Sequence, residues 1–173
     1  WVNTASLDSV ENLTIASDGL DSWWNVFRII QAGEVKTTNL PWVRDYQANL
    51  GQGIKERFLI AEQITDEELY KARQERERIV KQIDAVIIPG TVLVMPTAPC
   101  IAPKLDAEGA SLEAFRSNTM ALTCIAGLAG LPQVSMPVLT VDDCPVGVSL
   151  VGAHGSDEEL LNLARNLAPN KVV

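Results

Sequence analysis

The sequence is poor in the residues that hold metal ions and disulfide bonds. It contains one histidine and three cysteines, and no two cysteines have Cys-x-x-Cys spacing. A zinc site would therefore have almost no ligands to draw on, and we predict neither a metal nor a cofactor. The cysteines, Cys100, Cys124 and Cys144, are odd in number, which favours free thiols in a reducing compartment and predicts a cytoplasmic protein.

Positive charge and long apolar runs are also scarce. The net charge of −8 argues against a nucleic-acid partner, because neutralising phosphates requires clustered Lys and Arg. The apolar run from Met120 to Leu131 is too short to span a bilayer, so we expect no membrane partner. The chain begins at Trp1 and does not open with the pattern of a signal peptide, so we expect a piece of a longer polypeptide.

The sequence also lacks a recognisable catalytic constellation. There is no Gly-x-Ser-x-Gly elbow, no Ser-x-x-Lys pair and no phosphate-binding glycine loop. Ser149, in GVSLVG, comes closest to an elbow, but we expect it within a strand. His154 could form a thiol dyad with Cys124 or Cys144, yet no pattern brings a cysteine to it, and a loop histidine is the favoured interpretation. We therefore predict no catalytic residue in this chain.

Hydrophobic periodicity predicts several helices. The clearest spans residues 66–88, where Thr65 and Glu68 form a capping box and an apolar stripe follows. Residues 112–129 predict a helix capped by Ser111 and apolar on nearly every side, which favours a central position. A last helix should end near Ala168. Residues 21–50 predict two short helices separated by the segment GEVKTTNLP.

Three strands complete the predicted elements. Residues 91–96 are apolar throughout, which is typical of a strand covered on both faces in a parallel or mixed sheet. The segments QVSMPVLTV and PVGVSLVGA predict a hairpin across residues 142–145. Residues 1–20 predict a strand or loop. The alternation of helices and strands indicates an α/β domain without an internal boundary, so that residues 1–173 belong to one domain.

Four stretches, in order, resemble the amidase-signature family. The first is a helical segment ending in a long charged helix, from Phe27 to Arg76. The second, VLVMPTAPCIAP, resembles the family's strand followed by a Pro-Thr-x-x-Pro loop. The third and fourth, AGLAGLPQVSMPV and PVGVSLVGAHGSDEELLNLA, resemble its later strands, loop and closing helix. The resemblance covers nearly the whole chain and corresponds to roughly the last third of a typical member.

The resemblance implies a fold and a chemistry. The fold is an α/β domain with a mixed central sheet covered by helices. The chemistry is hydrolysis of a small carboxylic amide by a nucleophilic serine, a second serine and a lysine. All three residues lie N-terminal to the matched region, so the implied partner is the missing N-terminal part of the same polypeptide. A homodimer is a further expected partner.

The resemblance also implies substrate-binding residues. Arg116, Thr119 and Thr123 lie on the helix leading into AGLAGLP, which approaches the substrate in family members. Helix packing and capping are the competing interpretation of these three residues. Amidotransferase subunits usually carry Asn where Gly127 stands, and an acidic residue is expected where Met120 stands. Both departures favour a free-standing amidase over the amidotransferase.

Three hypotheses follow from the sequence. The first is the C-terminal fragment of an amide hydrolase, or of an amidotransferase subunit that acts in a complex. The second is a stand-alone binding or interaction module, which would have polar sheet edges. The third is an independent thiol hydrolase that uses His154.

Overall fold

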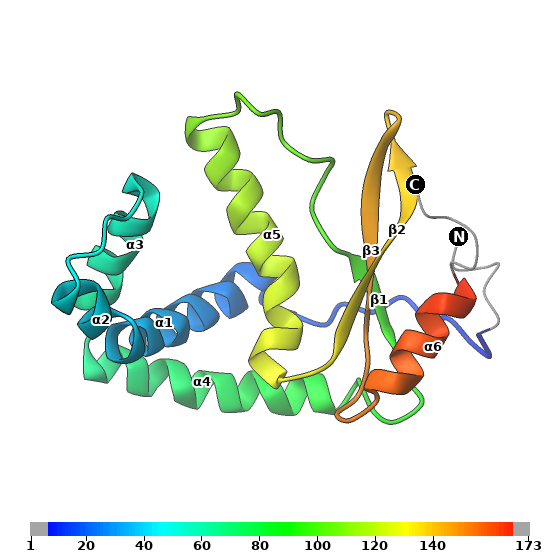
Figure 1. The fold of residues 1–173 in the computed structure, drawn as a ribbon. Helices are drawn as coiled ribbons and strands as arrows, with labels where there is room; N and C mark the ends of the chain where they lie inside the picture. Colours follow the sequence, from blue (N-terminus) through cyan, green and yellow to red (C-terminus); the bar gives the residue numbers. More distant parts are fainter. Residues whose placement is uncertain (1–6, 168–173) are drawn as a thin grey trace.

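The structure is a computed structural model and describes residues 7–167. The helices are α1 (Leu20–Thr38), α2 (Leu40–Asp45), α3 (Gln52–Gln63), α4 (Asp66–Asp84), α5 (Gly109–Ala129) and α6 (Asp157–Leu167), and the strands are β1 (Leu93–Pro96), β2 (Gln133–Val141) and β3 (Cys144–Val151). Helices α1, α4 and α5 pack together on one side of the strands, and α6 lies on the other (Figure 1). Residues 7–19 form no helix or strand, and the remainder of the predicted strand or loop lies outside the described residues.

Helix α1 corrects the prediction of two short helices separated by GEVKTTNLP. It runs unbroken through Gly33 and ends at Thr38, and α2 follows after Asn39 alone. Gly33 is buried, and a β-carbon there would lie 2.8 Å from Leu69 Cδ1. The glycine thus allows α1 and α4 to approach closely instead of ending the helix. Helix α3 was not predicted from the residue pattern.

Helix α4 begins as predicted. The Thr65 hydroxyl accepts a hydrogen bond from Glu68 N, and the Glu68 carboxylate accepts one from Thr65 N. The bond from Thr65 N, and after it a bond from the Thr65 hydroxyl to the same carboxylate, lower the pKa of Glu68. The helix ends at Asp84, four residues before the predicted end, and the chain turns through Ile87 before β1. Its predicted stripe is confirmed, since Ala72, Ile79 and Ile83 are buried.

Helix α5 begins at Gly109, three residues before the predicted start. Ser111 is therefore inside the helix, where its hydroxyl donates to Glu108 O at 3.1 Å. Gly130 ends the helix in the left-handed conformation with φ of 70°, a backbone geometry that glycine adopts without strain. The predicted central position holds for the C-terminal half alone, where every buried residue of the helix lies.

The strands form one antiparallel sheet with the order β1-β3-β2. The predicted hairpin joins β2 and β3 through Asp142 and Asp143, whose φ angles of 49° and 59° are those of a type I′ turn. Between Met136 and Leu139 the register shifts, so that Pro137 and Val138 lie opposite Gly147. Proline fits at such a bulge because it cannot donate to the ladder.

The two faces of the sheet differ in chemistry. One face is apolar and packs against α6, where Met136, Val148, Leu150, Leu160 and Ala164 form a buried cluster. On the opposite face, Met95 and Val151 join the larger core built by α1, α4 and α5. Further along that face, Ser135 and Ser149 form a pair in the β2–β3 register, and both carry hydroxyls. The architecture confirms the α/β class, and the three strands described here are antiparallel.

Candidate functional site

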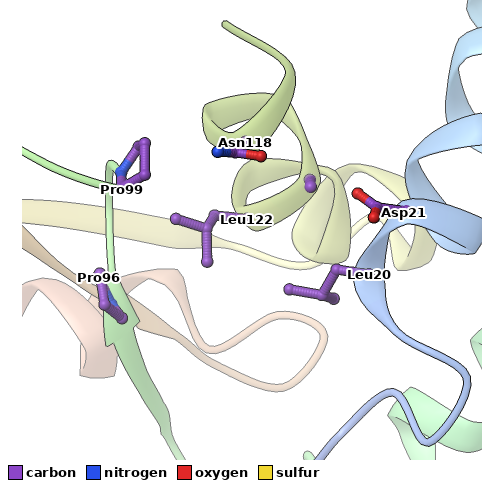
Figure 2. Close-up of a pocket in the computed structure, with 7 residues that line it drawn as sticks. Leu20, Asp21, Pro96, Pro99, Asn118 and Leu122 are labelled. Atoms are coloured by element: carbon purple, nitrogen blue, oxygen red, sulfur yellow. The ribbon is translucent and has the colours of Figure 1, made fainter. Parts of the chain in front are cut away.

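A cavity of about 460 Å³ opens beside the middle of α5 (Figure 2). Leu20 and Asp21 come from the start of α1, Pro96 and Pro99 from the end of β1 and the loop after it, and Asn118, Ala121 and Leu122 from α5. The lining is mainly apolar, with Asn118 and Asp21 as its polar side chains. A concave apolar site with few polar groups is typical of small-molecule binding.

The three predicted substrate-binding residues are not among the cavity-lining residues: at 100° per residue, their stripe on α5 faces away from Asn118, Ala121 and Leu122. The Arg116 guanidinium pairs with Glu113 at 2.5 Å. Thr119 Oγ1 donates to Phe115 O at 2.7 Å, and Thr123 Oγ1 donates to Thr119 O at 3.0 Å. Both threonine protons are thus occupied within the helix, and their hydroxyl oxygens keep lone pairs that can accept a hydrogen bond.

Sequence reasoning missed the cavity's own polar residues. Asn118 stands beside the predicted Thr119 in the sequence, and the Pro-rich loop that supplies Pro96 and Pro99 had been identified without a role. Asp21 could not be found this way, because α1 reaches the cavity only through the tertiary packing of α1 against α5.

A second polar group lies on the sheet face that carries Ser135. Ser149 is fully buried, at 0% exposure, and receives a hydrogen bond from Gln133 Nε2 at 2.8 Å. Thr97 Oγ1 lies 2.8 Å from both Ser149 Oγ and Ser135 Oγ. Thr97 follows directly after Pro96, which is one of the cavity residues. The cluster of hydroxyls and the cavity therefore share the segment from β1 into the following loop.

The thiol-dyad hypothesis finds no support among residues 7–167. His154 Nε2 lies 3.7 Å from Asp84 Oδ1, and no cysteine in this range pairs with it. Cys124 is buried at 1% exposure, and desolvation raises the pKa of its thiol to about 12. A thiol that keeps its proton at neutral pH is a poor nucleophile. Cys124 instead serves as a small core residue, donating to Ala121 O at 3.3 Å.

Neither a metal cluster nor a membrane-spanning helix is found in the part of the chain that the structure describes. No group of three or more His, Cys, Asp or Glu residues there is arranged to hold a metal ion. None of the described helices is both long and apolar enough to cross a bilayer.

Comparison with known proteins identifies the family. The Amidase family profile matches residues 23–161. Amidase 1 of Arabidopsis thaliana is 37% identical over 141 residues, which cover 82% of this chain and 33% of the relative. A glutamyl-tRNA(Gln) amidotransferase subunit of Sulfolobus acidocaldarius is 31% identical over 136 residues, covering 73% and 28%. The chain belongs to the amidase family, and it spans about a third of the length of these relatives.

Solved structures carry the same fold. A crystal structure of an amidase superposes with a TM-score of 0.71 at 24% identity, over 85% of this chain and 34% of the other. The corresponding Thermotoga maritima glutamyl-tRNA(Gln) amidotransferase subunit gives 0.65 at 22% identity, over 88% and 33%. The arrangement of helices and strands described above is therefore a portion of the amidase-signature fold.

Proposed function

We propose that this chain is the C-terminal third of a single-domain amide hydrolase, whose nucleophilic serine, second serine and lysine lie upstream. The reaction converts a carboxylic amide and water into a carboxylate and ammonia or an amine. The observation that carries the proposal is the family match from residue 23 to 161 combined with a span of only a third of Amidase 1. Residues 7–167 also contain no histidine–cysteine pair that could serve as a local nucleophile and base.

This part of the enzyme would supply one wall of the substrate pocket. The cavity at α5 has room for a small amide, and its apolar lining suits the acyl portion of such a substrate. Thr119 and Thr123 lie on the other face of α5, and their hydroxyl oxygens can accept a hydrogen bond there, because their protons are directed to helix carbonyls. Arg116 lies on the same stripe as the two threonines and would contact a polar group of a substrate that reaches this second face of α5.

Several exposed surfaces support a missing covering part of the same polypeptide. In the described sheet, β1 and β2 each have one side without a neighbouring strand. Large apolar side chains are exposed around α2 and α3. They are Trp42 on α2, Tyr46 directly after it, and Ile54, Leu59 and Ile60 on α3. Open strand edges and apolar patches of this kind are normally covered. The upstream part would cover the sheet, and a homodimer could bury the α2–α3 surface.

The amidotransferase alternative rests on the 31% identity to the Sulfolobus acidocaldarius protein. A side chain at Gly127 would meet an obstacle here, because its β-carbon would lie 2.8 Å from Phe27 Cε2. The asparagine that amidotransferase subunits are expected to carry at this position would therefore require Phe27 to move. Gly127 and Phe27 are thus matched to each other in this chain, and the departures at Gly127 and Met120 are what favour a free-standing amidase.

The proposal is tested with the complete polypeptide from the natural host. We expect its intact mass to exceed 18.8 kDa and its purified form to release ammonia or amine from small amides without a partner protein. An intact mass equal to 18.8 kDa would instead favour the stand-alone binding module. Hydrolysis that requires glutamyl-tRNA and further subunits would favour the amidotransferase.

The proposal that Thr119 and Arg116 contact the substrate has its own test. We expect Thr119→Val and Arg116→Ala to lower kcat/KM for several amides in the complete enzyme, with Lys104→Ala, in the exposed β1–α5 loop, as the control. Unchanged kcat/KM for both variants would assign these side chains to helix packing alone.

A further inference from the structure

The hydrogen bonds between the hydroxyls on the sheet have a direction, which follows from the protons and lone pairs that each side chain offers. Gln133 Nε2 carries only protons, so Ser149 Oγ accepts at this contact. Among residues 7–167 the remaining oxygen within hydrogen-bond reach of Ser149 Oγ is Thr97 Oγ1, at 2.8 Å. Ser149 is fully buried, and an undonated hydroxyl proton there would be costly. Ser149 therefore donates to Thr97.

The same reasoning fixes the next bond. The Thr97 hydroxyl has one proton and already accepts from Ser149, so it donates to Ser135 Oγ at 2.8 Å. Ser135 then accepts from Thr97 and keeps its own proton. It is exposed, and no further acceptor for that proton lies within hydrogen-bond distance among residues 7–167. The hydroxyl chain, defined as Gln133, Ser149, Thr97 and Ser135, thus ends on an outward donor.

The backbone around the hydroxyl chain holds it in place. Thr97 N donates to Gly147 O at 3.0 Å, which attaches the start of the β1–α5 loop to β3. A β-carbon on Gly147 would lie 2.8 Å from Thr97 Oγ1 and 2.9 Å from Ser135 Oγ. Only a glycine therefore leaves room for the two hydroxyls to meet. Successive hydroxyl bonds polarise one another, which strengthens the last donor.

We propose that Ser135 binds the carbonyl oxygen of an amide group and that the hydroxyl chain positions its proton for that bond. The proposal rests on the proposed function, because the amide belongs either to the substrate or to a backbone peptide of the upstream part. A neutral carbonyl oxygen fits a hydroxyl donor. The cavity residues Pro96 and Pro99 flank Thr97 in the sequence, so the hydroxyl chain and the candidate substrate pocket share the segment after β1.

The experiment compares Ser135→Ala with Thr140→Val in the complete enzyme. Thr140 lies on the same strand and is also exposed, but it is outside the hydroxyl chain, which makes it a matched control. If the acceptor is the substrate, we expect Ser135→Ala to lower kcat/KM about three- to tenfold, the value of one neutral hydrogen bond, with an unchanged Tm. If the acceptor is a backbone peptide, Tm should fall more than in Thr140→Val and all amides should be affected alike.

A second variant tests the hydroxyl chain as a whole rather than Ser135 alone. Gly147→Ala keeps every hydroxyl but inserts a methyl group against Thr97 and Ser135. We expect it to reproduce the effect of Ser135→Ala, and the double variant to lose little beyond either single variant. Independent, additive losses would overturn the positioning role.

The two proposals fail in different ways. If the wild-type enzyme hydrolyses no amide, the proposed function is wrong, and Ser135 is judged by Tm alone. If the wild-type enzyme is active, while Ser135→Ala matches Thr140→Val in kcat/KM and in Tm, the proposed role of Ser135 is overturned.

Discussion

The two halves of α5 differ both in sequence, the N-terminal half being the more polar, and in environment. The C-terminal half, residues 121–129, is packed against α1 and α4 and contains the buried residues Ala121, Cys124, Ile125, Ala126, Leu128 and Ala129. In the N-terminal half, residues 109–120, every residue is exposed or half-buried. This half extends away from the crossing of α4 and α5 (Figure 1). The C-terminal half supports the fold, and the exposed N-terminal half, with Ala121 and Leu122 at the junction, borders the candidate cavity.

The contacts at the end of α5 explain this difference. Arg76 Nε donates to Leu128 O at 2.7 Å and satisfies a carbonyl that the helix end leaves unpaired. Gly127 lies against the ring of Phe27, and Gly130 turns the chain toward β2. The N-terminal half has bonds within its own helix instead, as in the Glu113–Arg116 pair. Stability and function can therefore be separated along a single helix.

Thiol reactivity should show the largest difference between the packed and open regions. Cys124 lies in the packed half, whereas Cys100 is exposed in the loop before α5. Because burial raises the Cys124 pKa from 9.0 to about 12, its thiolate fraction at pH 8 should be lower by about a thousandfold. We expect iodoacetamide to label Cys100 and spare Cys124, as measured by peptide mass spectrometry. Rapid labelling of both thiols in the folded protein would contradict this burial.

The same shift predicts a pH dependence of stability. The folded protein keeps the Cys124 proton up to about pH 12, whereas the unfolded chain releases it near pH 9.0. Since the unfolded state then binds fewer protons, the free energy of unfolding should decrease as the pH rises through this window. Cys124→Ser should weaken that dependence, because serine does not titrate there.

Truncation of leucine should produce the next largest effect. Leu128 is 1% exposed, and Leu128→Ala should lower the free energy of unfolding by about 2–5 kcal/mol, as expected for a cavity in a packed core. Leu112→Ala, in the open half, should cost less than about 1 kcal/mol, because part of that side chain already contacts water. Denaturant titration measures both, and equal losses would mean that both halves are packed in the complete protein.

The helix-end contact should have a smaller effect. Arg76→Met removes the donor to Leu128 O but retains much of the apolar stem, and we expect a loss of about 1 kcal/mol. Arg73→Met, on the same helix and exposed, is the control and should change the free energy by less than about 0.5 kcal/mol. Urea unfolding at constant pH compares the two variants.

Local patterns were enough to predict much of this fold. The capping box at Thr65, the stripe of α4 and the hairpin at Asp142 depend on residues within a few positions of one another. The continuity of α1 could not be predicted in this way. Gly33 is typical of a break in sequence, and only the approach of Leu69 from α4 shows that the glycine serves packing instead. Long-range contact reversed the local preference.

The candidate site depends even more on such contacts. The hydroxyl chain joins Thr97, Ser135 and Ser149, which come from three different parts of the sequence. Serine in a predicted strand gives no indication of its neighbours until the register of β2 against β3 is known. Arg116, Thr119 and Thr123 were placed on α5 by resemblance alone, and their role in binding remains a prediction.

The smallest expected effect concerns the stability contribution of Arg116. Its side chain is 49% exposed and that of Glu113 is 67% exposed, and exposed pairs of this kind contribute about 0–1 kcal/mol. We expect Arg116→Ala to change the free energy of unfolding by less than about 0.5 kcal/mol, as measured by denaturant titration. Glu113→Ala is the matched control, because it breaks the same pair from the other side. If Arg116→Ala then lowers kcat/KM and Glu113→Ala does not, the loss reflects a contact between Arg116 and the substrate, since both variants are expected to have the stability of the wild type. Equal kinetic losses would show that the pair holds the open half of α5 in position.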